Sequence, residues 1–117
     1  MLKWNMTNAK DFLGKEVEVT IDRPLGTKHP KHGFVYEVNY GYVPNTKMTD
    51  GEELDAYVLG ETKPLKTFKG TCIAIVHRTN DDDDKLIVIK NGTNISDEEI
   101  EKQIAFQEKW FTHELIR

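Results

Sequence analysis

The hydrophobic pattern of the chain changes its period once, and this change constrains the fold more than any other feature. From residue 17 to residue 89, apolar residues form short runs separated by turns rich in Gly, Pro, Asn and Asp. Such spacing is typical of β-strands. Toward the C-terminus the spacing becomes helical, with one stripe formed by Ile100, Ile104, Gln107 and Phe111. The chain is therefore expected to consist of a β-rich body followed by one helix.

The β-rich part predicts four or five strands. The first candidate alternates apolar and polar residues, as a half-buried strand does, and a later one contains a continuous apolar run that favours burial on both faces. Cys72 belongs to that run and is expected to be a buried thiol. The predicted strands cover residues 17–21, 34–43, 54–59, 68–78 and 86–89.

The helix is predicted to begin at a capping box and to pack on the sheet. Ser96 and Glu99 have the spacing of this motif, and the periodic pattern extends the helix over residues 97–113. Phe106, Trp110 and Phe111 are interpreted as core residues. We find no linker and no repeat, so residues 1–117 are predicted to form a single domain. Its fold class is mainly β with a C-terminal helix (α+β), a small closed or nearly closed β-barrel with a helix against it.

Charge and composition exclude several classes of function. The net charge is −4, which argues against nucleic acid as a partner, since a phosphate backbone requires a basic surface. It does not exclude a small anionic substrate whose charge a metal neutralises. No segment is long enough to span a bilayer, and the N-terminus lacks the apolar stretch of a signal peptide. We therefore expect a cytoplasmic protein without a membrane partner.

Two acidic clusters are the strongest functional signal. Asp50, Glu52 and Asp55 follow the segment 39–42, and the run 81–84 of four aspartates precedes Lys85. Carboxylates gathered in this way repel each other unless a cation lies between them. Hard oxygen ligands suit Mg²⁺ or Mn²⁺, which hold phosphate substrates. The alternative is that each cluster is a solvated loop.

Several spaced segments resemble the soluble family I inorganic pyrophosphatases. The similarity includes Tyr36-Glu37-Val38-Asn39-Tyr40-Gly41-Tyr42-Val43-Pro44, the segment Asp50-Gly51-Glu52-Glu53-Leu54-Asp55 and the later Asp83-Asp84-Lys85-Leu86. A short pyrophosphatase-like subgroup is the most similar, by the segments Ile21 to Gly26 and Phe106 to Phe111. The resemblance implies a five-stranded, OB-like barrel of the pyrophosphatase type.

The resemblance also implies a reaction and a set of site residues. The reaction is Mg²⁺-dependent hydrolysis of pyrophosphate to two phosphates by metal-activated water, with Mn²⁺ as a possible substitute. By position, Glu52 would orient the water, and Asp55 would act in catalysis as well as in metal binding. The implied metal ligands are Asp50, Asp55, Asp83 and a further loop position at Asn80 or Asp81, of which we choose Asp81. The implied phosphate-binding residues are Arg23, Tyr40 and Lys85.

Departures from the family pattern keep two alternatives open. Glu52 replaces an aspartate, and Trp110-Phe111 replaces a tyrosine-lysine pair that binds phosphate in the family. The family's N-terminal hairpin is expected to be absent, and the segment 28–32, with two lysines and two histidines, either replaces the lost charge or is solvated. The alternatives are a hydrolase of another small phosphoanhydride and a non-catalytic protein that binds metal or an anion. A homo-oligomer remains possible.

Overall fold

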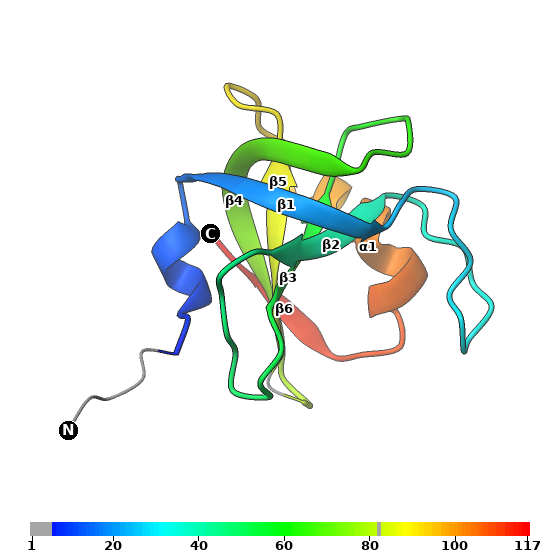
Figure 1. Cartoon of the computed structure of the whole chain (residues 1–117), viewed down its shortest axis with the longest axis horizontal. Coiled ribbons are helices and arrows are strands. Elements are labelled where there is room, and N and C mark those ends of the chain that lie inside the picture. The colour runs from blue at the N-terminus through cyan, green and yellow to red at the C-terminus, as the bar shows by residue number, and fades with distance from the viewer. Residues whose placement is uncertain (1–5, 82) are drawn as a thin grey trace.

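The computed structural model describes residues 6–81 and 83–117 (Figure 1). Within these ranges the chain forms six strands, one α-helix and one short 3-10 helix. The elements are η1 (Ala9–Phe12), β1 (Glu16–Arg23), β2 (Asn39–Val43), β3 (Leu54–Val58), β4 (Thr67–Arg78), β5 (Asp84–Ile89), α1 (Asp97–Glu108) and β6 (His113–Ile116). None of the helices in the described part of the chain is long and apolar enough to cross a membrane.

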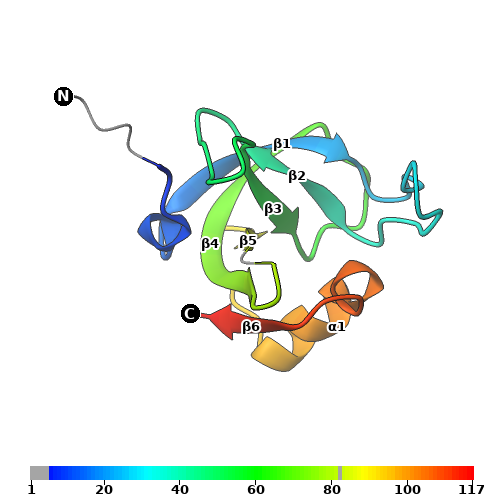
Figure 2. The same cartoon turned by 90° about the horizontal axis from the view of Figure 1, so that it is seen from below.

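Five of these strands close a barrel, as predicted. The sheet order is β1-β2-β3-β5-β4-β6, and a further pairing between β1 and β4 completes the ring. The pairing of β3 with β5 is parallel, and the other strand pairs are antiparallel. Seen from below in Figure 2, α1 and β6 lie on one side of the barrel. The α+β barrel with one helix is therefore confirmed.

The long strand β4 belongs to the barrel and also extends beyond it. Its first half, from Thr67 to Thr71, pairs with β1, and its second half, from Ile75 to Arg78, pairs with β6. A register irregularity between Cys72 and Ala74 separates the two halves. Such bulges bend a strand and increase its twist. The bend allows β4 to leave β1 and continue toward the helix.

Two residues of the segment 39–42 have structural reasons for their identity. A Cβ atom on Gly41 would clash with the Thr20 carbonyl oxygen, because β1 and β2 approach each other closely there. Asn39 is fully buried, and its side-chain oxygen accepts hydrogen bonds of 3.0 Å from the backbone N–H groups of Leu25 and Leu65. These contacts hold the segment that follows β1 and fix its course over the barrel.

The strands are apolar on both faces, so the molecule has two hydrophobic cores. The interior core fills the barrel and contains Ala9, Val17, Val19, Ile21, Val43, Leu54, Ala56, Val58, Cys72, Ile75, Leu86 and Val88. The outer core lies between the outside of the barrel and α1, and contains Tyr36, Val38, Tyr40, Tyr57, Leu59, Ala74, Val76, Ile87, Ile89, Ile100, Ile104 and Phe106. Burial of these side chains is the main driving force for both layers.

The structure differs from the sequence prediction at two boundaries. The helix ends at Glu108 rather than at residue 113, and β6, which was not predicted, follows after a short turn. The predicted strand 34–43 is a strand only from Asn39 onward. Residues 34–38 form a loop whose one bridge pairs Val35 with Lys28.

The prediction that Phe106, Trp110 and Phe111 all belong to the core is correct only for the first of them. Phe106 lies in the outer core, whereas the side chain of Trp110 is 63% exposed and that of Phe111 is partly exposed. Because the helix has already ended, the helical stripe does not continue through these two residues. Both aromatic side chains are left at the surface beside the outer core.

Candidate active site

The parallel pairing of β3 and β5 brings the two acidic segments to one end of the barrel. In this register Asp55 lies directly opposite Lys85. The turn before β3 and the loop before β5 must therefore leave the barrel at the same end, and Figure 1 shows both at the lower end. In Figure 2 the turn lies on the β1–β2 side, whereas the acidic loop lies next to β6.

Lys85 is the centre of the site, and its side chain is only 4% exposed. Its ammonium nitrogen lies 2.8 Å from the Tyr40 hydroxyl, 2.9 Å from Asp55 Oδ2 and 3.2 Å from Asp83 Oδ2. Burial opposes the charged form, but the carboxylates of Asp55 and Asp83 outweigh it and raise the pKa of Lys85. The sequence-predicted residues Tyr40, Asp55, Asp83 and Lys85 are thus brought together.

Tyr40 is a protonated phenol at this site. Burial first, and the nearby Asp55 carboxylate second, raise the pKa of Tyr40 well above its ordinary value. The Lys85 ammonium donates to the phenolic oxygen, so the Tyr40 hydroxyl keeps its own proton for donation. A neutral donor next to a buried cation is a suitable arrangement for a phosphate oxygen.

Arg78, at the end of β4, is a second buried cation. Its Nε and Nη2 atoms donate to the two carboxylate oxygens of Glu108 at 2.9 and 2.8 Å, a bidentate pair. Its Nη1 atom lies 3.5 Å from Asp81 Oδ2 and 3.7 Å from Asp83 Oδ2. The Phe111 ring centre lies 3.6 Å from the guanidinium carbon. Arg78 therefore joins the acidic loop to the end of the helix.

Glu108 is fully buried and remains ionised through its partners. Besides Arg78, the Tyr57 hydroxyl donates to Glu108 Oε2 at 2.5 Å, and Gln107 Nε2 donates to that hydroxyl at 2.7 Å. Burial favours the protonated form, but the hydrogen bonds from Arg78 and Tyr57 prevail and lower the pKa of Glu108. The network connects the helix to β3 and β4 beneath the site.

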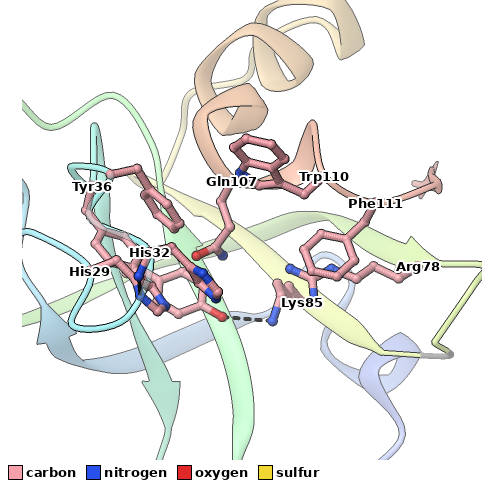
Figure 3. A pocket seen from close by; sticks show the side chains of 10 residues that line it. His29, His32, Tyr36, Arg78, Lys85, Gln107, Trp110 and Phe111 are labelled. Atoms are coloured by element: carbon pink, nitrogen blue, oxygen red, sulfur yellow. Dashed lines mark hydrogen bonds between the residues drawn. The ribbon is translucent and has the colours of Figure 1, made fainter.

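A pocket of about 590 Å³ opens above Lys85 (Figure 3). Figure 3 shows Tyr36, His29 and His32 on one side, Phe111 and Arg78 on the other, and Trp110 and Gln107 across the top, with Lys85 between them. The residues that line the pocket are His29, His32, Phe34, Tyr36, Tyr40, Arg78, Lys85, Gln107, Trp110 and Phe111. Of the basic segment 28–32, only the two histidines belong to this lining.

The remaining predicted site residues lie around this centre rather than in it. Asp50 and Glu52 are exposed in the turn before β3, where Asp50 Oδ1 accepts a hydrogen bond of 2.9 Å from the Glu52 backbone N–H. Arg23 is partly exposed at the end of β1 and donates to the Asp22 carbonyl oxygen at 3.2 Å. Asp81 is exposed and contacts Arg78.

Sequence reasoning did not identify Arg78, Glu108, Tyr57 or Gln107 as parts of the site. A signal for Glu108 was present, because it follows Ile100 and Ile104 at the same four-residue spacing and therefore occupies the buried stripe. A carboxylate in such a position requires a buried partner. Arg78, which ends an apolar strand, was a candidate for that partner.

The carboxylates present can hold a divalent cation together with a substrate. The described residues contain no group of three or more His, Cys, Asp or Glu side chains arranged as a complete metal site. However, Asp55 and Asp83 both contact the Lys85 ammonium through Oδ2, and their side chains are 36% and 31% exposed. Mg²⁺ is usually bound by one or two carboxylates plus waters and substrate phosphates, so this donor set fits it.

Comparisons with known proteins give a family from a family model and a similar fold from solved structures. A family model described as inorganic pyrophosphatase matches residues 7–114. The inorganic pyrophosphatase structure from Helicobacter pylori is similar with a TM-score of 0.67 and 18% identity, over 99% of this chain and 90% of that one. The corresponding structure from Ehrlichia chaffeensis gives 0.66 and 16%, over 93% and 86%. No curated protein sequence matches the chain.

Proposed function

The chain belongs to the inorganic pyrophosphatase family, a family of hydrolases, and from this membership we propose that it hydrolyses pyrophosphate to two phosphates with the help of Mg²⁺. One observation supports the proposal above all others. Lys85, Tyr40, Asp55 and Asp83 form a hydrogen-bonded group at the edge of a pocket, and this group combines phosphate-binding donors with oxygen ligands for a metal.

In this proposal, Lys85 and Tyr40 bind phosphate oxygens. The ammonium group supplies a positive charge, and the phenol donates a hydrogen bond. Arg78 also lines the pocket and adds positive potential without leaving its Glu108 partner. Arg23 is not part of the pocket lining, and its assignment to a substrate phosphate rests on its position in the segment that resembles the family. Charge developing on the phosphates is stabilised by donors fixed in place before the reaction.

Asp55 and Asp83 are the residues that would hold Mg²⁺, and Asp50 and Asp81 belong to segments at the same end of the barrel. The bound metal supplies charge neutralisation for the phosphates and lowers the pKa of a coordinated water. Mn²⁺ has the same preference for oxygen ligands. Lys85 contacts both carboxylates, so it would stand beside a metal held by them and beside the substrate phosphate.

Glu52 is the residue that would orient the attacking water, and Asp55 would assist it. Glu52 belongs to the turn before β3, at the same end of the barrel as Asp55. Its carboxylate is exposed and can accept a proton from water. The assignment rests on the position of Glu52 in the segment that resembles the family.

The test is release of phosphate from pyrophosphate with and without Mg²⁺, for the wild type and for Asp55→Asn. We expect metal-dependent release in the wild type and a loss of at least about 100-fold in the variant. Asp11→Asn is a matched control, because Asp11 is an exposed aspartate in η1, distant from the site in sequence. Circular dichroism confirms that each variant folds. Full activity of Asp55→Asn would contradict the assignment of the site.

A second candidate function is binding of an anion without turnover. The observation that favours it is the position of Asp50 and Glu52. Both are exposed in the turn before β3, and within residues 6–81 and 83–117 neither has a hydrogen bond or ion pair with the Lys85 group. If this alternative holds, calorimetry shows binding of pyrophosphate whereas the same sample releases no phosphate. Measurable turnover excludes it.

A further inference from the structure

The pocket has more aromatic surface than pyrophosphate can use. Seven of the ten side chains that line it contain rings, and its volume of about 590 Å³ is within the range of pockets that bind drug-sized ligands, about 300–1,000 Å³. Pyrophosphate is small, compact and entirely polar, so it contacts only the Lys85 end. The rest of the pocket suits a ligand with a flat apolar group attached to its phosphates.

Trp110 is placed to contact such a flat group. It is 63% exposed and yet lines the pocket, where Figure 3 shows it across the opening from Lys85. The ammonium of Lys109 lies 4.9 Å from the centre of its ring. An exposed indole at the mouth of a pocket is a suitable surface for stacking, and every nucleobase offers a π-face to it.

The side of the pocket that carries His29 and His32 is a preformed group of rings. His29 packs against His32 and Phe34 with ring centres 4.7 and 4.8 Å away. His29 Nδ1 accepts hydrogen bonds of 3.1 Å from the backbone N–H groups of Lys31 and His32, so this nitrogen is unprotonated. In neutral His29 the proton is therefore on Nε2, which can donate to a polar group of a ligand.

We propose that the pocket binds a nucleoside diphosphate, with the base stacked on Trp110 and the diphosphate at Lys85. This inference rests on the proposed function, because it assigns the same reaction to an esterified diphosphate. The water oxygen forms a bond to the terminal phosphorus, and the bond from that phosphorus to the bridging oxygen breaks. The bridging oxygen keeps the electron pair and becomes an oxygen of the nucleoside monophosphate. The water's protons pass to the products or to solvent.

The experiment compares hydrolysis of pyrophosphate, ADP and UDP by the wild type, Trp110→Ala and Val35→Ala with Mg²⁺ present. We expect kcat/KM of the wild type to be higher for ADP than for pyrophosphate. Trp110→Ala should lower kcat/KM for ADP at least about fivefold, and should also lower the ratio of ADP to pyrophosphate activity. Val35→Ala should keep the wild-type ratio, because Val35 is 48% exposed in the loop between β1 and β2 and does not line the pocket.

Each further outcome distinguishes this inference from the proposed function. Turnover of pyrophosphate without turnover of either nucleotide supports the proposed function and overturns the inference. An equal loss for both substrates in Trp110→Ala also overturns it, since stacking concerns only the base. If no substrate is hydrolysed, calorimetry with ADP tests whether the pocket binds this class of ligand. Binding that Trp110→Ala weakens upholds the ligand class and rejects the reaction, whereas absence of binding rejects the ligand class as well.

Discussion

The interior core and the outer core use opposite faces of the same strands, but they differ in chemistry. The interior core consists of apolar side chains together with the thiol of Cys72. The outer core includes three tyrosines, and the buried groups Arg78, Lys85 and Glu108 border it. Two neighbours on β5 show this difference: Lys85 belongs to the candidate site, and Leu86 belongs to the interior core. The candidate site is therefore built on the outer face of β5, whereas the inner face of the same strand is apolar.

The largest effect on stability is expected at the buried ion pair between Arg78 and Glu108 in the outer layer. Glu108→Ala leaves the buried guanidinium of Arg78 without its bidentate partner, and breaking a buried pair in this way costs about 3–5 kcal/mol. Urea denaturation measures the loss. Glu101→Ala on the same helix is the control, because its contact with His113 is 45% exposed on the glutamate side and should be worth less than about 1 kcal/mol. Equal losses would mean that the network does not stabilise the outer layer.

A substitution in the interior core should lower the stability of the protein and leave its activity nearly unchanged. Leu86 is fully buried, and Leu86→Ala should lower the free energy of unfolding by about 2–5 kcal/mol through lost burial and an internal cavity. The activity per folded molecule should stay within about twofold of the wild type, because the side chain faces away from the site. Denaturation and steady-state kinetics on the same sample provide both values. A large loss of activity in a folded variant would show that the two faces are coupled.

Lys85→Met, at the residue before Leu86, should lower the activity and leave the stability nearly unchanged. We expect turnover to fall at least about 100-fold, because the variant lacks the ammonium donor at the phosphate site. Stability should change by no more than about 1 kcal/mol, since the methionine fills the space and the partly exposed Asp55 and Asp83 can bind water instead. Steady-state kinetics measures the turnover of the variant, and urea denaturation measures its stability. A variant that retains activity would exclude Lys85 from the site.

The smallest effect appears only in acid. The folded protein holds the pKa of Glu108 below its ordinary value of 4.5, so Glu108 contributes its full stability above that pH. The contribution is lost as the pH falls through the lowered pKa. The difference in unfolding free energy between the wild type and Glu108→Ala should therefore be constant from about pH 7 to pH 5 and should narrow below about pH 4.5. A difference that widens in acid would contradict this sign.

Much of the fold could be predicted from the sequence because its pattern is local. The apolar runs give β1, β3, β4 and β5, and Ser96 marks the start of the helix by accepting a hydrogen bond of 3.1 Å from the Glu99 backbone N–H. The four-residue strand β6 has too short a pattern to be recognised, and it forms because β4 offers a free edge. Residues 34–38 have strand propensity, but tertiary packing places Tyr36 and Val38 against the helix instead.

The site was less predictable because its contacts join distant parts of the chain. Resemblance to the family led to Tyr40, Asp55, Asp83 and Lys85, which the structure brings together. The pair between Arg78 and Glu108 spans 30 residues, and no local spacing connects the two. Nor does a sequence pattern show that the helix ends at Glu108, which places Trp110 at a pocket rather than in the core.

The order of the elements along the chain has a consequence for synthesis on the ribosome. All five strands of the barrel precede residue 90, whereas the helix that covers its outer face follows. Synthesis adds about 5–20 residues per second, so the remaining segment emerges roughly seconds after the barrel strands. During this interval Tyr57, Ile87 and Ile89 lack their covering layer. A nascent barrel therefore exposes an apolar, aggregation-prone surface. We expect chaperones to bind this surface until the helix packs on it.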